Sequence, residues 1–175
     1  GAEPISSFDD GTTEATVAVN MYEDVVQSAL VNTRWRFATN QKQVNRLTDK
    51  PTGRYKFAYQ LPSDLIMLHG ATVNNNLIEY QVYGDKLYAD TAETDTVIVD
   101  YSFRANEIDF PSYFTLAVEF SLAIIFATSI ARDANLASLM TQRADLSMAK
   151  ARTLDSQQQT TRKLETSRFL SARRS

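Results

Sequence analysis

Residues 111–131 constrain the fold of this chain more than any other stretch, because they hold a single charged side chain, Glu119. Their apolar residues fall on almost every side of a helix, so most of that helix must be covered. The run is long enough to span a membrane, but Glu119 lies near its middle, polar residues dilute it and no positively charged flank sets an orientation. We therefore expect a helix over 111–131 that is buried within the domain or between subunits of an assembly.

Two further helices are expected on either side of this run. After a cap at Thr12 or Thr13, Val17, Met21 and Val25 keep a near-heptad stripe, which predicts a helix over 13–32. A narrower amphipathic stripe predicts a helix over 134–154, and its members are Leu136, Leu139, Met140, Arg143, Leu146 and Ala149. For the helix over 111–131, Asp109 is a fair N-cap and Pro111 suits the first turn.

The strands are expected within residues 34–103. The alternation of Trp35 and Phe37 predicts a strand over 34–38, residues 39–54 are polar and indicate a loop or hairpin arm, and a second strand follows over 55–61. Gly84 and Asp85 form a two-residue hairpin loop, which pairs Val82 with Leu87 and Tyr83 with Lys86. Residues 96–103 are rich in β-branched side chains and predict a third strand.

The predicted fold class is therefore α+β. We expect a mainly helical bundle, with a small antiparallel β-meander inserted between the N-terminal and C-terminal helices and an extended C-terminal tail. The boundary falls between a folded domain at 1–161 and a tail at 162–175. The chain starts at Gly1 rather than Met, so we expect its start to be trimmed.

Charge is divided unevenly along the chain. Residues 150–175 hold seven basic and two acidic side chains, a net charge of +5, whereas the remainder carries −8. An acidic body argues against ordinary nucleic-acid binding, which requires a basic surface to neutralise phosphates. The basic tail is the part able to contact an anionic partner, and its alternative interpretation is a solvated helix end with a frayed terminus.

Candidate catalytic groups are few. His69, the single histidine, lies near Ser63 and Asp64, but triad members normally come from separate segments and no nucleophile-elbow glycine pattern accompanies them. Paired carboxylates occur in turns, where solvated acids are expected, and there is no cysteine. We therefore expect no catalytic, cofactor-binding or metal-binding residues, no cofactor, and a protein that is not an enzyme.

Four short phrases occur in a fixed order along the chain. Gly-Ala-Glu-Pro-Ile stands at residues 1–5, Trp-Arg-Phe-Ala at 35–38, Leu-Pro-Ser-Asp at 61–64 and Asp-Phe-Pro at 109–111. In this order they resemble the head-to-tail adaptor proteins of tailed bacteriophages, the family of tail tubular protein A and related head-completion connectors. The resemblance covers nearly the whole chain, and the order and spacing of the phrases are its most specific part.

The resemblance implies a structural virion protein in the neck or tail of a tailed phage, assembled in the host bacterial cytoplasm. Copies form a ring, commonly dodecameric, between the portal protein and the tail nozzle. The ring extends the channel for genomic double-stranded DNA, which passes without sequence-specific contact, and it helps to retain and eject the genome. No membrane span is implied.

The same resemblance assigns roles to two sets of residues. Helices form the wall of the ring, so inter-subunit packing is expected from Phe114, Val118, Phe120, Leu122 and Ile125. The C-terminal segment docks on the portal, and its expected contacts are Arg162, Lys163, Arg168, Phe169, Leu170, Arg173 and Arg174. Two alternatives stay open: a tail-completion or neck subunit of other symmetry, and a virion-associated peptidoglycan hydrolase, which would need a buried carboxylate pair.

Overall fold

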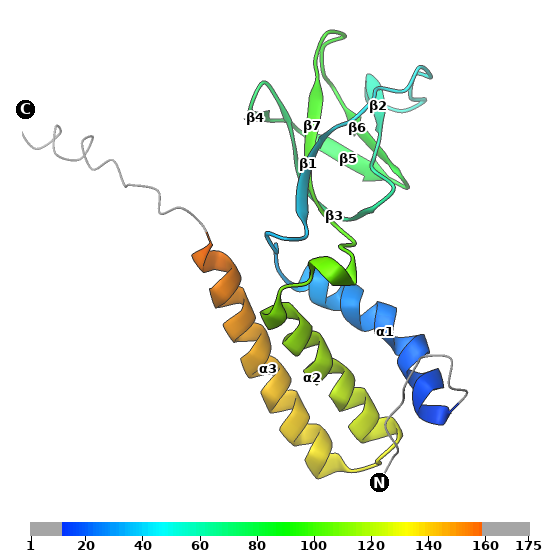
Figure 1. Ribbon diagram of the computed structural model, residues 1–175. Helices are drawn as coiled ribbons and strands as arrows, with labels where there is room; N and C mark the ends of the chain where they lie inside the picture. The colour runs from blue at the N-terminus through cyan, green and yellow to red at the C-terminus, as the bar shows by residue number, and fades with distance from the viewer. Residues whose placement is uncertain (1–11, 159–175) are drawn as a thin grey trace, which may run out of the picture.

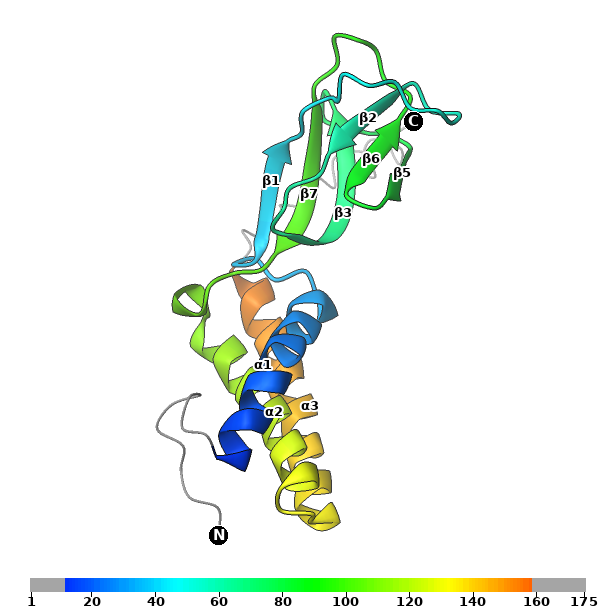
Figure 2. The same ribbon diagram turned by 90° about the vertical axis from the view of Figure 1, so that its right-hand side faces the viewer.

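The helices and strands of this protein occupy opposite ends of the molecule. The computed structural model describes residues 12–158, and Figures 1 and 2 both show the strands stacked above the helices. Within that range the helices are α1 (Thr13–Asn32), the one-turn 3₁₀ helix η1 (Glu107–Asp109), α2 (Ser112–Ser129) and α3 (Ala134–Gln157). The strands are β1 (Thr39–Gln43), β2 (Phe57–Gln60), β3 (Leu65–Val73), β4 (Asn76–Leu77), β5 (Tyr80–Tyr83), β6 (Lys86–Ala89) and β7 (Val97–Phe103).

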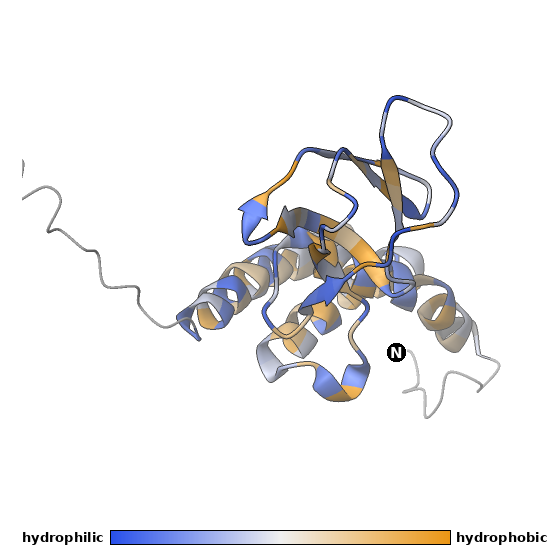
Figure 3. Cartoon of the chain, turned by 90° about the horizontal axis from the view of Figure 1, so that it is seen from above, coloured by the Kyte–Doolittle hydropathy of each residue, from blue (hydrophilic) through white to orange (hydrophobic). Residues whose placement is uncertain are grey.

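The strands form two antiparallel sheets that share one core. The first sheet has the order β1-β7-β3-β4 and the second has the order β2-β6-β5. Alternate residues of β7, namely Val97, Val99 and Tyr101, are buried against Tyr59 and Leu87 of the second sheet. Seen from above, hydrophobic and hydrophilic residues both occur along the strands (Figure 3), as expected for sheets that bury one side each.

The prediction of a mainly helical bundle with a small β-meander is wrong, because the chain has two sheets with seven strands in the described range. The β5–β6 hairpin does form with the expected register, Val82 opposite Leu87 and Tyr83 opposite Lys86. Strand β6 then pairs with β2 rather than with β7, and β7 lies between β1 and β3. The two-residue loop identified the hairpin, but a local signal holds no information on which distant strand completes each sheet.

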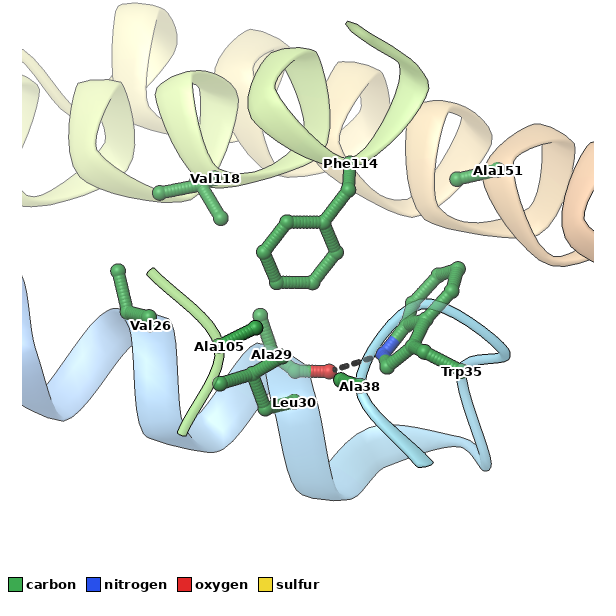
Figure 4. Packing of buried hydrophobic residues seen from close by; sticks show 9 residues of the cluster. All are labelled: Val26, Ala29, Leu30, Trp35, Ala38, Ala105, Phe114, Val118 and Ala151. Carbon is green, nitrogen blue, oxygen red and sulfur yellow. Dashed lines mark hydrogen bonds between the residues drawn. The ribbon is translucent and has the colours of Figure 1, made fainter. Parts of the chain in front are cut away.

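Trp35 belongs to the helical core and not to a strand. Residues 34–38 form a turn, and the strand β1 begins only at Thr39. The Trp35 Nε1–H donates a hydrogen bond of 2.8 Å to the Ala29 carbonyl, and its ring meets that of Phe114 edge to face at 5.2 Å (Figure 4). The alternation of Trp35 and Phe37 therefore reflects aromatic packing on α2, which overrides the strand propensity of the segment.

Helices α2 and α3 form an antiparallel pair, and α1 packs against α2 (Figure 1). Asp109 closes η1 instead of capping α2, whose N-cap position is taken by Pro111. Between the two helices, Arg132 adopts a left-handed conformation with φ 51°, and the Asp133 carboxylate accepts hydrogen bonds from the backbone amides of Asn135 and Leu136. Asp133 thus satisfies two of the free N–H groups at the start of α3.

An ion-pair network lies at the junction between the helical layer and the strand layer, which we call the waist of the molecule. Arg104 follows β7 directly, and its guanidinium contacts Glu23 of α1 at 2.9 Å and also pairs with Glu107 of η1. Phe103, one residue earlier, packs against both the helical core and the sheet core. Through the ion pairs of Arg104 and the packing of Phe103, the helices and the sheets are connected by side-chain contacts as well as by the chain.

Candidate functional site

The buried face of α3 is made of alanines. Ala137, Ala144 and Ala151 lie seven residues apart, all three are buried, and α3 packs along the length of α2. A spacing of seven keeps side chains on one face of a helix, and small side chains allow two helix axes to approach closely. The sequence indicated a different face, so the predicted stripe of Leu136, Leu139, Met140, Arg143, Leu146 and Ala149 is not the one that packs inside the protomer.

Four leucines of α3 lie outside its alanine face and are exposed. Leu136, Leu139, Leu146 and Leu154 are 38%, 45%, 72% and 38% exposed, and we call these four residues the outer stripe. Spacings of three, seven and eight residues place them on one face of the helix. An exposed apolar stripe on a helix is typical of a surface that another protein covers.

Helix α2 is mostly apolar, and the rest of the protomer leaves much of its surface uncovered. Of the residues expected in inter-subunit packing, Phe114 and Val118 lie in the core of the protomer (Figure 4), and they have almost no area left to bury against a second chain. Phe120, Leu122 and Ile125 are half-buried, and a single chain leaves their packing against another subunit as a prediction. Leu116, which the sequence did not single out for this role, is 46% exposed.

By length and composition alone, α2 is a candidate for a membrane-spanning helix. Only 22% of its residues are buried within the described part of the chain, so it is unlike a fully enclosed core helix. A single helix that meets these criteria does not establish a membrane span, because core helices of soluble proteins meet them too. What the structure establishes is a helix with apolar area still to be covered.

A groove between α2 and α3 adjoins the outer stripe. It has a volume of about 700 Å³, and its lining includes Leu116 and Glu119 from α2 and Lys150 and Leu154 from α3. The lining of the groove is mainly apolar and includes one acidic and one basic side chain, Glu119 and Lys150. Leu154 belongs both to this lining and to the outer stripe. Its depth and chemistry suit an apolar side chain of a second protein better than a small polar substrate.

His69 is paired with Ser102 and not with Ser63. Its Nε2 lies 2.8 Å from the Ser102 Oγ across β3 and β7, whereas Asp64 accepts a hydrogen bond from Tyr101. Burial, with a smaller effect of the Arg34 charge, lowers the pKa of His69 below its ordinary value of 6.5. Ser102 is 1% exposed in the middle of a sheet, so a substrate carbonyl has no path to its hydroxyl.

The carboxylates of the described residues form no metal-binding cluster. No group of three or more His, Asp or Glu side chains within residues 12–158 is placed to hold a metal ion. Asp155 is the acid that is buried in this range. Its carboxylate accepts hydrogen bonds from the Tyr113 hydroxyl at 2.9 Å and from the Arg36 backbone amide at 3.1 Å, which joins α3, α2 and the turn after α1.

The contact with Asp155 affects the pKa of the Tyr113 hydroxyl. Burial, together with the hydrogen bond to the charged Asp155, raises the pKa of Tyr113 to about 12. Tyr113 therefore remains a neutral donor at all physiological pH values, and the pair has the character of a structural bond. Neither residue was indicated by the sequence, since a tyrosine near a helix start and an aspartate near a helix end are common on protein surfaces.

The predicted portal-docking residues, from Arg162 to Arg174, lie outside the described residues. Comparison of the chain with known protein families and with curated proteins gives no match.

Proposed function

We propose that this protein is a structural subunit of a tailed-phage virion, a head-to-tail adaptor that assembles as a dodecameric ring between the portal and the tail nozzle. The single observation that carries the proposal is the outer stripe, because α3 buries alanines and leaves four leucines exposed. A cyclic assembly needs two different complementary surfaces on each subunit. The α2–α3 hairpin offers one of them, and the order of the sequence phrases supplies the resemblance to the adaptor family.

Charge supports the same role. The protein has a net charge of −3 although its last residues are basic, so the body that would surround a channel is acidic. An acidic wall repels DNA and favours sliding over sequence-specific contact. The basic tail at 162–175 would dock on the portal, and many equal copies would add their modest affinities into a tight seal.

The proposal describes assembly and not catalysis. The pair of His69 and Ser102 is closed to substrate, and Asp155 is held by a tyrosine and a backbone amide rather than by a second carboxylate. Both observations disfavour a peptidoglycan hydrolase that works through these groups. For α2, Glu119 and the packing of Phe114 and Val118 favour a helix that is covered by protein rather than by lipid.

The test is sedimentation velocity of this protein alone and mixed with the portal protein of the same genome. We expect co-sedimentation at about one adaptor per portal subunit, with little ring formed by the adaptor alone. A monomer that does not bind the portal would contradict the proposal. A closed ring of different symmetry would instead favour a tail-completion or neck subunit.

Two further experiments test the docking role of the tail and the exclusion of lipid from α2 and α3 separately. A chain that ends at residue 161 should stay folded and lose portal binding, and binding that survives the truncation would contradict the docking role of the tail. The full chain should also fail to float with phosphatidylcholine and phosphatidylglycerol vesicles. Flotation that depends on Leu116 and on the outer stripe would show that α2 and α3 face lipid instead.

A further inference from the structure

A cleft at the waist of the molecule gathers three arginines. It lies between the turn after α1 and the C-terminal end of α3, beside the base of β1, and its volume is about 610 Å³. We call it the waist cleft, and it is lined by Thr33, Arg34, Arg36, Thr39, Arg152, Asp155 and Ser156. The arginines come from two segments far apart in the sequence, so the folding of the helices brings them together.

The guanidinium groups of these arginines have little to neutralise them. Within residues 12–158, Arg34, Arg36 and Arg152 form no ion pair, and the ion pairs of this range belong to Arg104. Arg152 donates a hydrogen bond to the Asn32 side chain. A guanidinium has about five N–H donors, so most donors of the three arginines point elsewhere.

Asp155 is the one acid among the seven lining residues, and it is already bonded. It is 4% exposed, and its two oxygens accept from the Tyr113 hydroxyl and the Arg36 backbone amide. The waist cleft therefore holds three positive charges and one buried negative charge. The charge of Arg34 is also felt at His69, whose pKa is lowered first by burial and then by this neighbouring cation.

The arrangement defines the class of ligand. Guanidinium groups form parallel hydrogen bonds to the two oxygens of a carboxylate or a phosphate. Duplex DNA carries about one charge for every 1.7 Å of its axis, so the field of a protein with net charge −3 repels it at long range. A short protein segment with one or two carboxylates carries little charge outside the cleft, and three local arginines suffice to attract it.

We propose that the waist cleft binds a carboxylate-bearing segment of a protein partner, with Arg34, Arg36 and Arg152 as the groups that hold the carboxylates. Binding in the waist cleft does not depend on ring assembly, because the waist cleft and the outer stripe involve different sides of α3. Helical periodicity places Arg152 on a different side of α3 from Leu139 and Leu146. A partner in the waist cleft would contact both layers at their junction.

The experiment uses a short fluorescein-labelled peptide with two glutamates and the full-length protein at low ionic strength, with binding followed by fluorescence anisotropy. The test variant is Arg34→Gln/Arg36→Gln, because neither side chain has a hydrogen bond among those described and the Arg36 amide that holds Asp155 is retained. The control is Arg132→Gln/Arg143→Gln, which removes the same charge from the loop before α3 and from the N-terminal half of that helix, outside the lining of the waist cleft. Equal melting temperatures of the three proteins establish that folding is unchanged.

We expect the peptide to bind the natural protein, to weaken at least tenfold in the test variant and to change less than twofold in the control. Affinity should also fall as sodium chloride is added, since the contacts are between charges. Equal losses in both variants would mean a general charge effect and would overturn the site, as would an absence of peptide binding. Tighter binding of a short DNA duplex through the same arginines would overturn the class of partner.

Discussion

Tyr113 shows how a single hydroxyl joins three segments of this protein. Its O–H donates to Asp155, and Asp155 also accepts from the Arg36 amide, so α2, α3 and the turn after α1 meet at one carboxylate. In Tyr113→Phe the carboxylate of Asp155, a residue that is 4% exposed in the natural protein, loses a charge-assisted donor. We expect the free energy of unfolding to fall by about 1.5–3 kcal/mol, as measured by urea denaturation.

Tyr88→Phe is the matched control for this change. The Tyr88 ring contacts Tyr55 and Tyr83, and its hydroxyl has no hydrogen bond among those of the described residues. Its loss should change the free energy of unfolding by less than about 0.5 kcal/mol. Equal effects of the two substitutions would contradict a structural role for the contact between Tyr113 and Asp155.

His69 gives the protein a specific dependence on pH. Its pKa in the folded state is below the ordinary 6.5, so folding favours the neutral ring and the unfolded chain binds the extra proton. The stabilisation that comes from the neutral His69 ring is therefore present above pH 6.5. It is lost as the pH falls from 6.5 toward the pKa of His69 in the folded state. We expect the free energy of unfolding to fall more between pH 7.5 and pH 5.5 in the natural protein than in His69→Gln.

The carboxylates that Arg104 stabilises do not interfere with this comparison. Hydrogen bonds from Arg104 lower the pKa of Glu23 and of Glu107 below 4.5, so their contribution is lost only at more acidic pH. They also titrate equally in both proteins. Parallel stability curves for His69→Gln and the natural protein between pH 7.5 and pH 5.5 would show that burial of His69 has no such consequence.

At the scale of elements, the hairpin of β5 and β6 depends on the backbone of one glycine. Gly84 has φ +62°, a left-handed conformation, and an added Cβ would meet nothing within 4 Å. The penalty of Gly84→Ala is therefore conformational rather than steric, and we expect a loss of about 1 kcal/mol in the free energy of unfolding.

Gly53→Ala provides the control for this substitution, because Gly53 is equally open and does not have a left-handed φ. It should leave stability unchanged or raise it by up to about 1 kcal/mol, since alanine restricts the unfolded chain. Thermal denaturation of both variants measures the contrast. A Gly84→Ala protein as stable as Gly53→Ala would mean that the hairpin relaxes to a different turn.

The same hairpin marks the limit of what the sequence predicts. Local signals were sufficient for it, because the register follows from a two-residue loop, and for helix α1, whose cap and stripe are both in the sequence. The partners of β7 were not predictable, since pairing of distant strands depends on tertiary packing. Trp35 was misassigned for a related reason, because its aromatic neighbours Tyr113 and Phe114 are about 80 residues away.

The site was harder to predict than the fold. On α3 both an alanine heptad and a leucine stripe are visible in the sequence, and hydrophobicity alone favours the leucines as the buried face. The close approach of α2 selects the alanines instead, because small side chains fill the narrow space between the two helices. The three arginines of the waist cleft were invisible in the sequence because two distant segments contribute them.

The molecule as a whole consists of two cores with one junction. The helical core surrounds Trp35, the sheet core surrounds Tyr101, and Phe103 packs against both. Because Phe103 packs against both cores, the helices and the sheets are joined by side-chain contacts as well as by the chain. A subunit of this kind is suited to a ring in which the helices contact neighbours and the sheets project from one side.

The outer stripe is the surface on which this whole-molecule interpretation depends. In Leu139→Gln/Leu146→Gln two exposed leucines become polar, so the folded monomer should keep its stability within about 0.5 kcal/mol. If the proposed ring forms through the outer stripe, assembly on the portal should be lost, because each subunit interface loses apolar area and the loss recurs around the ring. Leu77→Gln is the control, since Leu77 is 80% exposed on β4, far from α3. Sedimentation with the portal protein measures the outcome, and a ring that forms equally well with both variants would place the subunit contact on another face of the helices.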